Sequence, residues 1–165
     1  MNQHAEAFPR LDHARILSLY PNDLLWQSSD ERIRRGLDLA FPKVHPGMRP
    51  HGSRVLVQLR APKRMSEGGL VLVEETKETE RAQGAIAKVI ALGPLAYRNR
   101  ESMEPWKEGA WCLPGDFVRV PKWGGDRWER PVPEHDTEVA WFAFFQDHEI
   151  IGDVLVNPLE IKAFV

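Results

Sequence analysis

The amino-acid sequence predicts a mainly β fold, a small β-barrel that carries a short helical extension at its N-terminus. The first observation is that the apolar runs from Arg54 onward are short and alternate with polar residues, a period of two that is typical of strands. The second is that glycine and proline separate these runs, and many short strands punctuated in this way indicate a barrel or a sandwich.

Residues 1–47 form the predicted extension. Apolar residues recur at helical spacing just before Pro21, so we expect a short helix that ends there. Ser28 and Glu31 have the spacing of a capping box, and a second, amphipathic helix is predicted over residues 29–40. Prolines and a glycine then end the helical pattern. Because two short helices bury little surface alone, we expect them to pack on the barrel or on a partner.

Residues 48–165 form the predicted barrel. The stretch 122–136 is rich in glycine, proline, tryptophan and charge, and we predict a long loop there. We expect strands at residues 54–59, 70–73, 85–92, 117–120, 139–145, 149–151, 153–156 and 161–165.

The composition argues against several kinds of partner. The chain has 165 residues and a formal net charge of −2, with no basic stripe that would follow a nucleic-acid backbone. Arg32, Arg34 and Arg35 are flanked by acidic residues and are interpreted as a solvated helix face. No apolar run approaches the ~20 residues that span a membrane, and the N-terminus has no secretory signal. With a single cysteine and therefore no intrachain disulfide, we expect a soluble cytoplasmic protein.

The sequence contains no recognisable catalytic or metal-binding set. The six histidines and the single Cys112 do not have the spacing of zinc ligands. Asp147, His148 and Glu149 place two acids around an imidazole, but they stand between two apolar runs and are interpreted as a hairpin turn. Cys112 is expected to be a small buried side chain. We therefore predict a protein that is not an enzyme and that binds no metal or cofactor.

Five motifs, each weak by itself, become informative through their order along the chain. They are an Arg-Pro turn and strand at 48–57, a Gly-Gly pair with three aliphatic residues at 66–72, a strand that ends in glycine at 83–93, a Pro-Gly-Asp turn and strand at 114–118, and closing apolar strands at 153–165. In this order they resemble the co-chaperonins of the GroES type, the chaperonin-10 family. The resemblance covers residues 48–117 and 153–165.

The resemblance implies a GroES-like barrel with a particular arrangement of loops. A mobile loop is expected at about 61–82, and a roof-type insertion is expected at about 94–112. The stretch at about 121–152 stands outside the family pattern and is interpreted as an insertion.

The resemblance also implies a binding segment, made of Gly68, Gly69, Leu70, Val71 and Leu72. Charged residues flank the aliphatic triplet on both sides, and glycine pairs are costly to fix, so the segment suits an exposed arm that becomes ordered on binding. One such arm binds weakly, whereas a ring of identical arms binds firmly. The implied partner is a GroEL-type chaperonin, which uses the ATP, and the implied assembly is a heptameric ring. The alternative is an ordinary β-strand after a Gly-Gly turn.

In the family, the last strand pairs with the first strand of a neighbouring subunit, and pairing within one subunit is the alternative. The residues implied at this interface are Arg54, Val55, Leu56, Val57, Ile161, Ala163, Phe164 and Val165.

Two other functions fit parts of the sequence. The barrel can serve as a virion decoration or connector component, whose partner is a viral capsid or connector protein and whose Gly-Gly arm is a relic. The extension and the insertion also suggest a bacteriophage-encoded co-chaperonin as a hypothesis. A GroES-like barrel occurs in medium-chain alcohol dehydrogenases as well, but this chain has no Gly-Xaa-Gly-Xaa-Xaa-Gly unit and no room for a nucleotide-binding domain.

Overall fold

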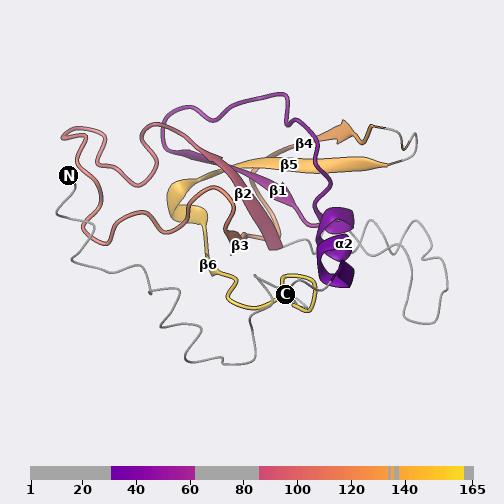
Figure 1. Ribbon diagram of the computed structural model, residues 1–165. Helices are drawn as coiled ribbons and strands as arrows, with labels where there is room; N and C mark the ends of the chain where they lie inside the picture. Colours follow the sequence, from indigo (N-terminus) through magenta and orange to yellow (C-terminus); the bar gives the residue numbers. More distant parts are fainter. Residues whose placement is uncertain (1–30, 62–85, 134, 136–137, 162–165) are drawn as a thin grey trace.

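The computed structural model describes residues 31–61, 86–133, 135 and 138–161, and these form one antiparallel sheet with a helix beside it (Figure 1). The order of the strands in the sheet is β4-β5-β1-β2-β3-β6. The elements are α2 (Glu31–Ala40), β1 (Arg54–Leu59), β2 (Ile86–Leu92), β3 (Phe117–Arg119), β4 (Asp126–Pro131), β5 (Val139–Gln146), a 3-10 turn η3 (Asp147–Glu149) and β6 (Gly152–Asp153).

Strand β1 lies at the centre of the sheet. It pairs with β2 on one side, where Leu59 lies opposite Ala87, and with β5 on the other, where Leu59 lies opposite Trp141. Every residue of β1 after Arg54 is buried. Both faces of the sheet are therefore covered at this strand, which explains why its sequence is an almost continuous apolar run.

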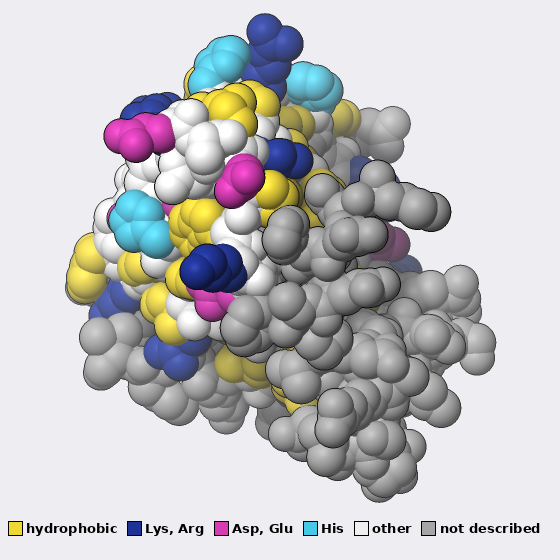
Figure 2. Space-filling model, turned by 90° about the vertical axis from the view of Figure 1, so that its left-hand side faces the viewer, with side chains coloured by type: hydrophobic (Ala, Val, Ile, Leu, Met, Phe, Trp, Pro, Cys, Tyr) yellow, Lys and Arg dark blue, Asp and Glu magenta, His cyan; other side chains and the backbone are white. Residues whose placement is uncertain are grey.

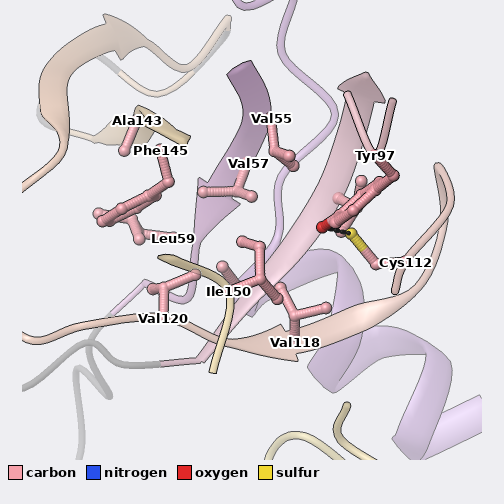
Figure 3. Close-up of a cluster of buried hydrophobic side chains, with 12 residues drawn as sticks. Val55, Val57, Leu59, Tyr97, Cys112, Val118, Val120, Ala143, Phe145 and Ile150 are labelled. Carbon is pink, nitrogen blue, oxygen red and sulfur yellow. Dashed lines mark hydrogen bonds between the residues drawn. The ribbon is translucent and has the colours of Figure 1, made fainter. Parts of the chain in front are cut away.

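The main core covers one face of the sheet. Val55 and Val57 project from β1 toward Val118 of β3 and Phe145 of β5, and Ile150 closes the cluster from the segment after η3 (Figure 3). These positions alternate along each strand, as the period of two requires. The core thus contains residues of β1, β3 and β5 together with Ile150, which follows η3.

The opposite face is also apolar. Leu56, Ala140 and Phe142 are buried there, and Val44 and Trp128 pack against them. Val44 lies in the segment between α2 and β1, so this segment covers part of the second face of the sheet.

Helix α2 packs on the sheet through its C-terminal end. Ala40 and the adjacent Phe41 are buried against Ile86 and Phe117, and Leu37, one turn earlier, joins the same cluster. This helix lies within the range 29–40 that the apolar spacing predicts, and it packs on the sheet, which is one of the two arrangements expected for it. The rest of the predicted helical extension, residues 1–30, lies outside the described residues. None of the helices that the structure describes is long and apolar enough to cross a membrane.

The sheet is open rather than closed into the predicted barrel. β4 and β6 stand at its two ends and do not pair with each other within the described residues. The sheet stays open because β6 contributes only two residues to it, too few to close a barrel. Of the strand expected at 153–156, only Asp153 belongs to β6. The chain turns further on, at 157–160, where the Asn157 carbonyl oxygen accepts a hydrogen bond from the Glu160 amide.

Two further predictions were wrong in detail. The stretch 122–136 contains β4, an edge strand, rather than only a loop. The strand expected at 149–151 is replaced by η3, which Glu149 stabilises by accepting a hydrogen bond from the Gln146 amide at 2.7 Å. The strand expected at 70–73, most of the strand expected at 161–165 and the helix expected before Pro21 lie outside the described residues.

Candidate functional site

The described residues that flank residues 62–85, a range that holds most of the expected mobile loop, lie side by side on the two central strands. β1 ends at Leu59, β2 begins at Ile86, and the Arg60 amide donates to the Ile86 carbonyl oxygen at 2.9 Å. The residues implied in binding, Gly68, Gly69, Leu70, Val71 and Leu72, lie outside the described residues. What the structure provides is the base from which residues 62–85 leave the sheet and to which they return.

Both terminal parts of the chain contact this base. The Ala61 amide donates to the carbonyl oxygen of Ala40, the last residue of α2, at 2.8 Å. The guanidinium of Arg60 donates through Nη1 to the carbonyl oxygens of Pro158 and Ile161, at 2.5 and 2.8 Å. The base is therefore held by residues far before and far after it in the sequence.

At the opposite end of the sheet, two of the motifs meet. The Gly93 amide donates to the Arg54 carbonyl oxygen at 2.8 Å, and the Leu95 amide donates to the Gly52 carbonyl oxygen at 3.0 Å. Gly52 has a φ of +61°, which favours glycine, and a β carbon on Gly93 would overlap the Gly52 carbonyl oxygen. Gly52 is thus favoured by its backbone conformation, and Gly93 is required by its contact with the Gly52 backbone.

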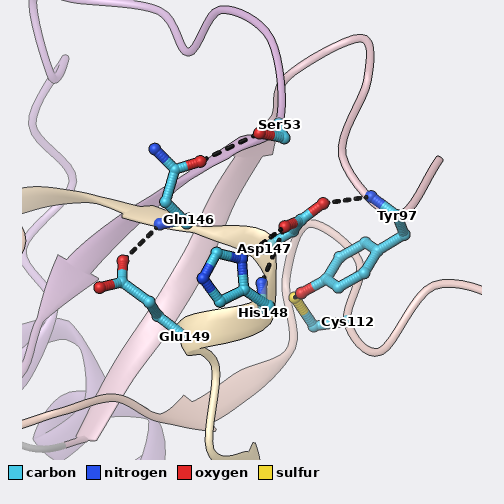
Figure 4. A network of polar contacts seen from close by, with 7 residues as sticks. All are labelled: Ser53, Tyr97, Cys112, Gln146, Asp147, His148 and Glu149. Carbon is cyan, nitrogen blue, oxygen red and sulfur yellow. Dashed lines mark hydrogen bonds and ion pairs between the residues drawn. The ribbon is translucent and has the colours of Figure 1, made fainter. Parts of the chain in front are cut away.

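A buried carboxylate organises the same end (Figure 4). Asp147 is 3 % exposed and accepts hydrogen bonds from the amides of Tyr97, at 2.9 Å, and His148, at 2.8 Å. Its own amide donates to the Ser53 carbonyl oxygen at 3.0 Å. Tyr97 has a φ of +58°, an unfavourable backbone conformation for a residue with a side chain, and the bond to Asp147 holds it there. Asp147 therefore has a structural role in a short 3-10 turn, which differs from the predicted hairpin turn.

Cys112 is fully buried, as predicted, and its Sγ lies 3.2 Å from the Tyr97 hydroxyl. Burial, and then the hydrogen bond to Cys112, raise the pKa of Tyr97 above its ordinary value. Neither group is exposed to a substrate, so this pair belongs to the core.

The long connection between β2 and β3 includes the range expected for the roof-type insertion. Tyr97, Trp106 and Trp111 form an aromatic cluster in it, with ring centroids 5.3–5.9 Å apart. Both tryptophans pack against the main core. These aromatic residues therefore stabilise the connection by packing.

The turn before β4 belongs to the stretch that the sequence predicts as a loop, and it presents an exposed tryptophan. Trp123 is 70 % exposed. Arg127 fastens the turn, because its guanidinium donates to the carbonyl oxygens of Gly124 at 2.9 Å, Lys122 at 2.8 Å and Pro121 at 3.2 Å. Partial burial lowers the pKa of Arg127. A Trp-Gly-Gly sequence followed by arginine is the only signal of this turn in the chain itself.

The strand implied at the intersubunit contact, β1, lies in the middle of the sheet. Both of its backbone edges are paired within the subunit, with β2 on one side and with β5 on the other. Val55 and Val57 are core residues, and Ile161 packs against the α2 cluster of its own subunit. Ala163, Phe164 and Val165 lie outside the described residues, while Arg54 is exposed and Leu56 is buried on the second face.

The surface carries charges of both signs. Figure 2 shows basic, acidic and histidine side chains interspersed with hydrophobic ones on one face, without a field of a single sign. Among the described residues, no group of three histidine, cysteine or acidic side chains is arranged to hold a metal ion.

The comparison with known families identifies the chain. A family model described as the chaperonin 10 kDa subunit (Cpn10) matches residues 47–138, which is more than half of the sequence. The match includes β1, the binding segment, the connection between β2 and β3, and β4, so it continues into the range 121–152. No curated protein matches the chain. The Cpn10 family consists of co-chaperonins and is not an enzyme family. The family match, which covers more than half of the sequence, shows that this chain belongs to the chaperonin-10 family, the GroES-type co-chaperonins.

Proposed function

We propose that the chain is a subunit of a ring-shaped co-chaperonin that caps a GroEL-type chaperonin and assists protein folding. The contact residues in this proposal are Gly68, Gly69, Leu70, Val71 and Leu72. The observation that carries it is the base of residues 62–85: both ends are fixed on neighbouring central strands of a chain that belongs to this family.

The fixed base suits an arm that reaches another protein. Three aliphatic side chains buried in a groove supply at most about 5–9 kcal/mol, and the ordering of the arm offsets part of this. A single arm is therefore a weak ligand. In a ring, seven-fold in this proposal, the first arm that binds raises the effective concentration of the others. Changes in the nucleotide state of the chaperonin then need to alter each contact only slightly to release the whole ring.

Assembly of such a ring needs edges that a neighbour can pair with. In the described residues, the outer edges of β4 and β6 are the two ends of the sheet. Exposed strand edges are natural sites for pairing with another chain. We propose that the subunits meet through these ends of the sheet rather than through β1. In this proposal ATP binds to the chaperonin, the co-chaperonin itself needs no cofactor, and the complex works in the cytoplasm.

The test is a binding experiment with a purified bacterial chaperonin and ATP, read by electron microscopy and sedimentation. We expect capped chaperonin particles with the wild-type chain. The double variant L70S/L72S should assemble to the same mass and fail to cap. The matched control is L39S/L113S, because Leu39 and Leu113 are exposed leucines outside the binding segment. A wild-type protein that assembles but never binds the chaperonin would overturn the proposal and favour the virion assembly protein.

A further inference from the structure

We propose that helix α2 and the turn at 157–161 together position the chaperonin-binding segment, by clamping Arg60 and Ala61 at its base. This inference rests on the proposed function, because it assigns a role in chaperonin binding to two parts of the chain outside residues 62–85. The turn at 157–161 is called the C-terminal turn below.

The first part of the clamp is a backbone contact. The last carbonyl groups of a helix have no partner within the helix. In α2 the carbonyl oxygen of Ala40 accepts the hydrogen bond of the Ala61 amide, and that of Leu37 accepts the bond of the Phe41 amide at 2.7 Å. Ala61, the last described residue before residues 62–85, therefore supplies the hydrogen-bond partner for the last carbonyl group of α2.

The second part is Arg60. Its guanidinium binds two carbonyl oxygens of the C-terminal turn, those of Pro158 and Ile161. Hydrogen bonds with an ionised donor are stronger than neutral ones. The turn is itself ordered by the buried Asn157, whose Oδ1 accepts the Leu159 amide at 3.0 Å. Arg60 therefore binds a structured turn rather than a free chain end.

The helix and the turn also contact each other. A β carbon on Gly36 would stand 2.7 Å from Cδ1 of Leu159, so only glycine at position 36 allows this approach without displacing Leu159. Leu37 and Leu159 belong to the same apolar cluster, which also contains Ile86, the first described residue after residues 62–85. The cluster thus links the extension, the C-terminal turn and the return point of the segment.

A further bond keeps the extension in place. Gln58 is buried in β1, and its Nε2 donates to the Pro42 carbonyl oxygen at 2.8 Å. The chain that follows α2 is therefore fastened to the same strand that leads into the base. Undocking of α2 breaks these contacts together, and the base of the arm loses its fixed direction.

The functional consequence follows from the entropy of binding. An arm with a rigid base loses less conformational entropy when it binds, and its effective concentration at the chaperonin groove is higher. The clamp therefore raises the affinity for the chaperonin without any contact to it. Arg60 is a positioning residue in this scheme, since it acts through the base of the arm.

The test compares the variants R60M and R119M in the full chain. Arg119 is an exposed arginine on β3 of the same sheet, and methionine keeps an unbranched apolar stem at either site. Hydrogen exchange at the Ala61 amide reports the clamp, and the concentration of co-chaperonin that half-saturates the chaperonin with ATP reports its function. In R60M we expect exchange about 10-fold faster and half-saturation at a roughly 3- to 10-fold higher concentration, from the loss of charge-assisted bonds. R119M should match the wild type in both.

A second variant acts on the clamp from the other side. G36V places a branched side chain against Leu159, and it should accelerate exchange at Ala61 and weaken chaperonin binding in the same direction as R60M. Circular dichroism and ring mass verify that each variant folds and assembles. Unchanged Ala61 exchange in R60M, or faster exchange with wild-type affinity, would overturn the clamp while leaving the proposed function intact. A wild-type chain that does not bind the chaperonin overturns both.

Discussion

The carbonyl oxygen of Gly52 occupies the place where a β carbon on Gly93 would stand. The two residues belong to motifs that are about 40 positions apart in the sequence, and the contact fixes the turn before β1 against the end of β2. The methyl group of an alanine at position 93 would therefore clash with the Gly52 backbone. That backbone cannot move aside without breaking the hydrogen bonds that join the start of β1 to the end of β2.

We expect Gly93→Ala to lower the free energy of unfolding by about 1–3 kcal/mol, the usual penalty for overpacking. The measurement is urea denaturation at a fixed protein concentration, because assembly adds to apparent stability. Gly152→Ala is the control, since no atom lies within 4 Å of the added carbon. Equal stability of the two variants would show that the turn adapts.

The buried carboxylate of Asp147 should matter for stability. Asp147→Ala leaves the amides of Tyr97 and His148 without their acceptor, and we expect a loss of about 2–3 kcal/mol. Asp147→Asn keeps one acceptor oxygen and should lose about half as much. Asp126→Ala changes an exposed residue of the edge strand β4, so its unfolding curve should stay within about 0.5 kcal/mol of the wild type.

Trp123, just before β4, and Trp128, within β4, should differ strongly in how much their substitution destabilises the fold. Trp128 packs against Phe142 and Phe144, with ring centroids 5.9 and 4.7 Å away, and its Nε1 donates to the Pro46 carbonyl oxygen at 2.7 Å. We expect Trp128→Ala to cost about 3 kcal/mol. Trp123→Ala should change stability by less than about 0.5 kcal/mol, because Trp123 is largely exposed. Thermal unfolding of both variants tests this prediction. A large loss of stability with Trp123→Ala would contradict the exposed position of Trp123.

Stability should fall in strongly basic solution because of Tyr97. Desolvation raises the pKa of the folded Tyr97 above its ordinary value of 10.0, so the hydroxyl stays neutral in the folded chain while it ionises in the unfolded chain. The contribution is complete below pH 10 and is lost as the pH rises above it, with a slope of about 1.4 kcal/mol per pH unit. Unfolding measured from pH 9 to 11.5 should show this slope, and Tyr97→Phe should remove it. An unchanged slope in Tyr97→Phe would assign the effect to other groups.

Strands that bury apolar side chains could be predicted from the sequence, and strands at the edge of the sheet could not. The apolar runs of β1 and β5 are clear in the sequence, and their predicted and observed ranges agree to within a residue. β4 is mostly exposed, and its sequence from Asp126 to Pro131 is largely charged, which makes it resemble a loop. It becomes a strand because the aromatic residues of β5 lie across from it, a tertiary effect that local composition does not contain.

The candidate site divides in the same way. The strand patterns on either side of the expected mobile loop predicted β1 and β2, and the structure confirms both strands. The binding segment itself lies outside the described residues, and motif order says nothing about which strands lie next to each other. The hydrogen bonds of Arg60 and Ala61 join positions about 100 and 20 residues apart, and no local pattern announces them.

The pairing of β1 with β5 also has a consequence for synthesis on the ribosome. Arg54 of β1 lies opposite Gln146 of β5, so β1 cannot pair along its second edge until the chain has been translated past Gln146. Contacts of such long range form slowly, and an unfilled hydrophobic edge invites association with other nascent chains. This member of a co-chaperonin family thus completes its own core late, and its yield in the cell should depend on early protection of β1.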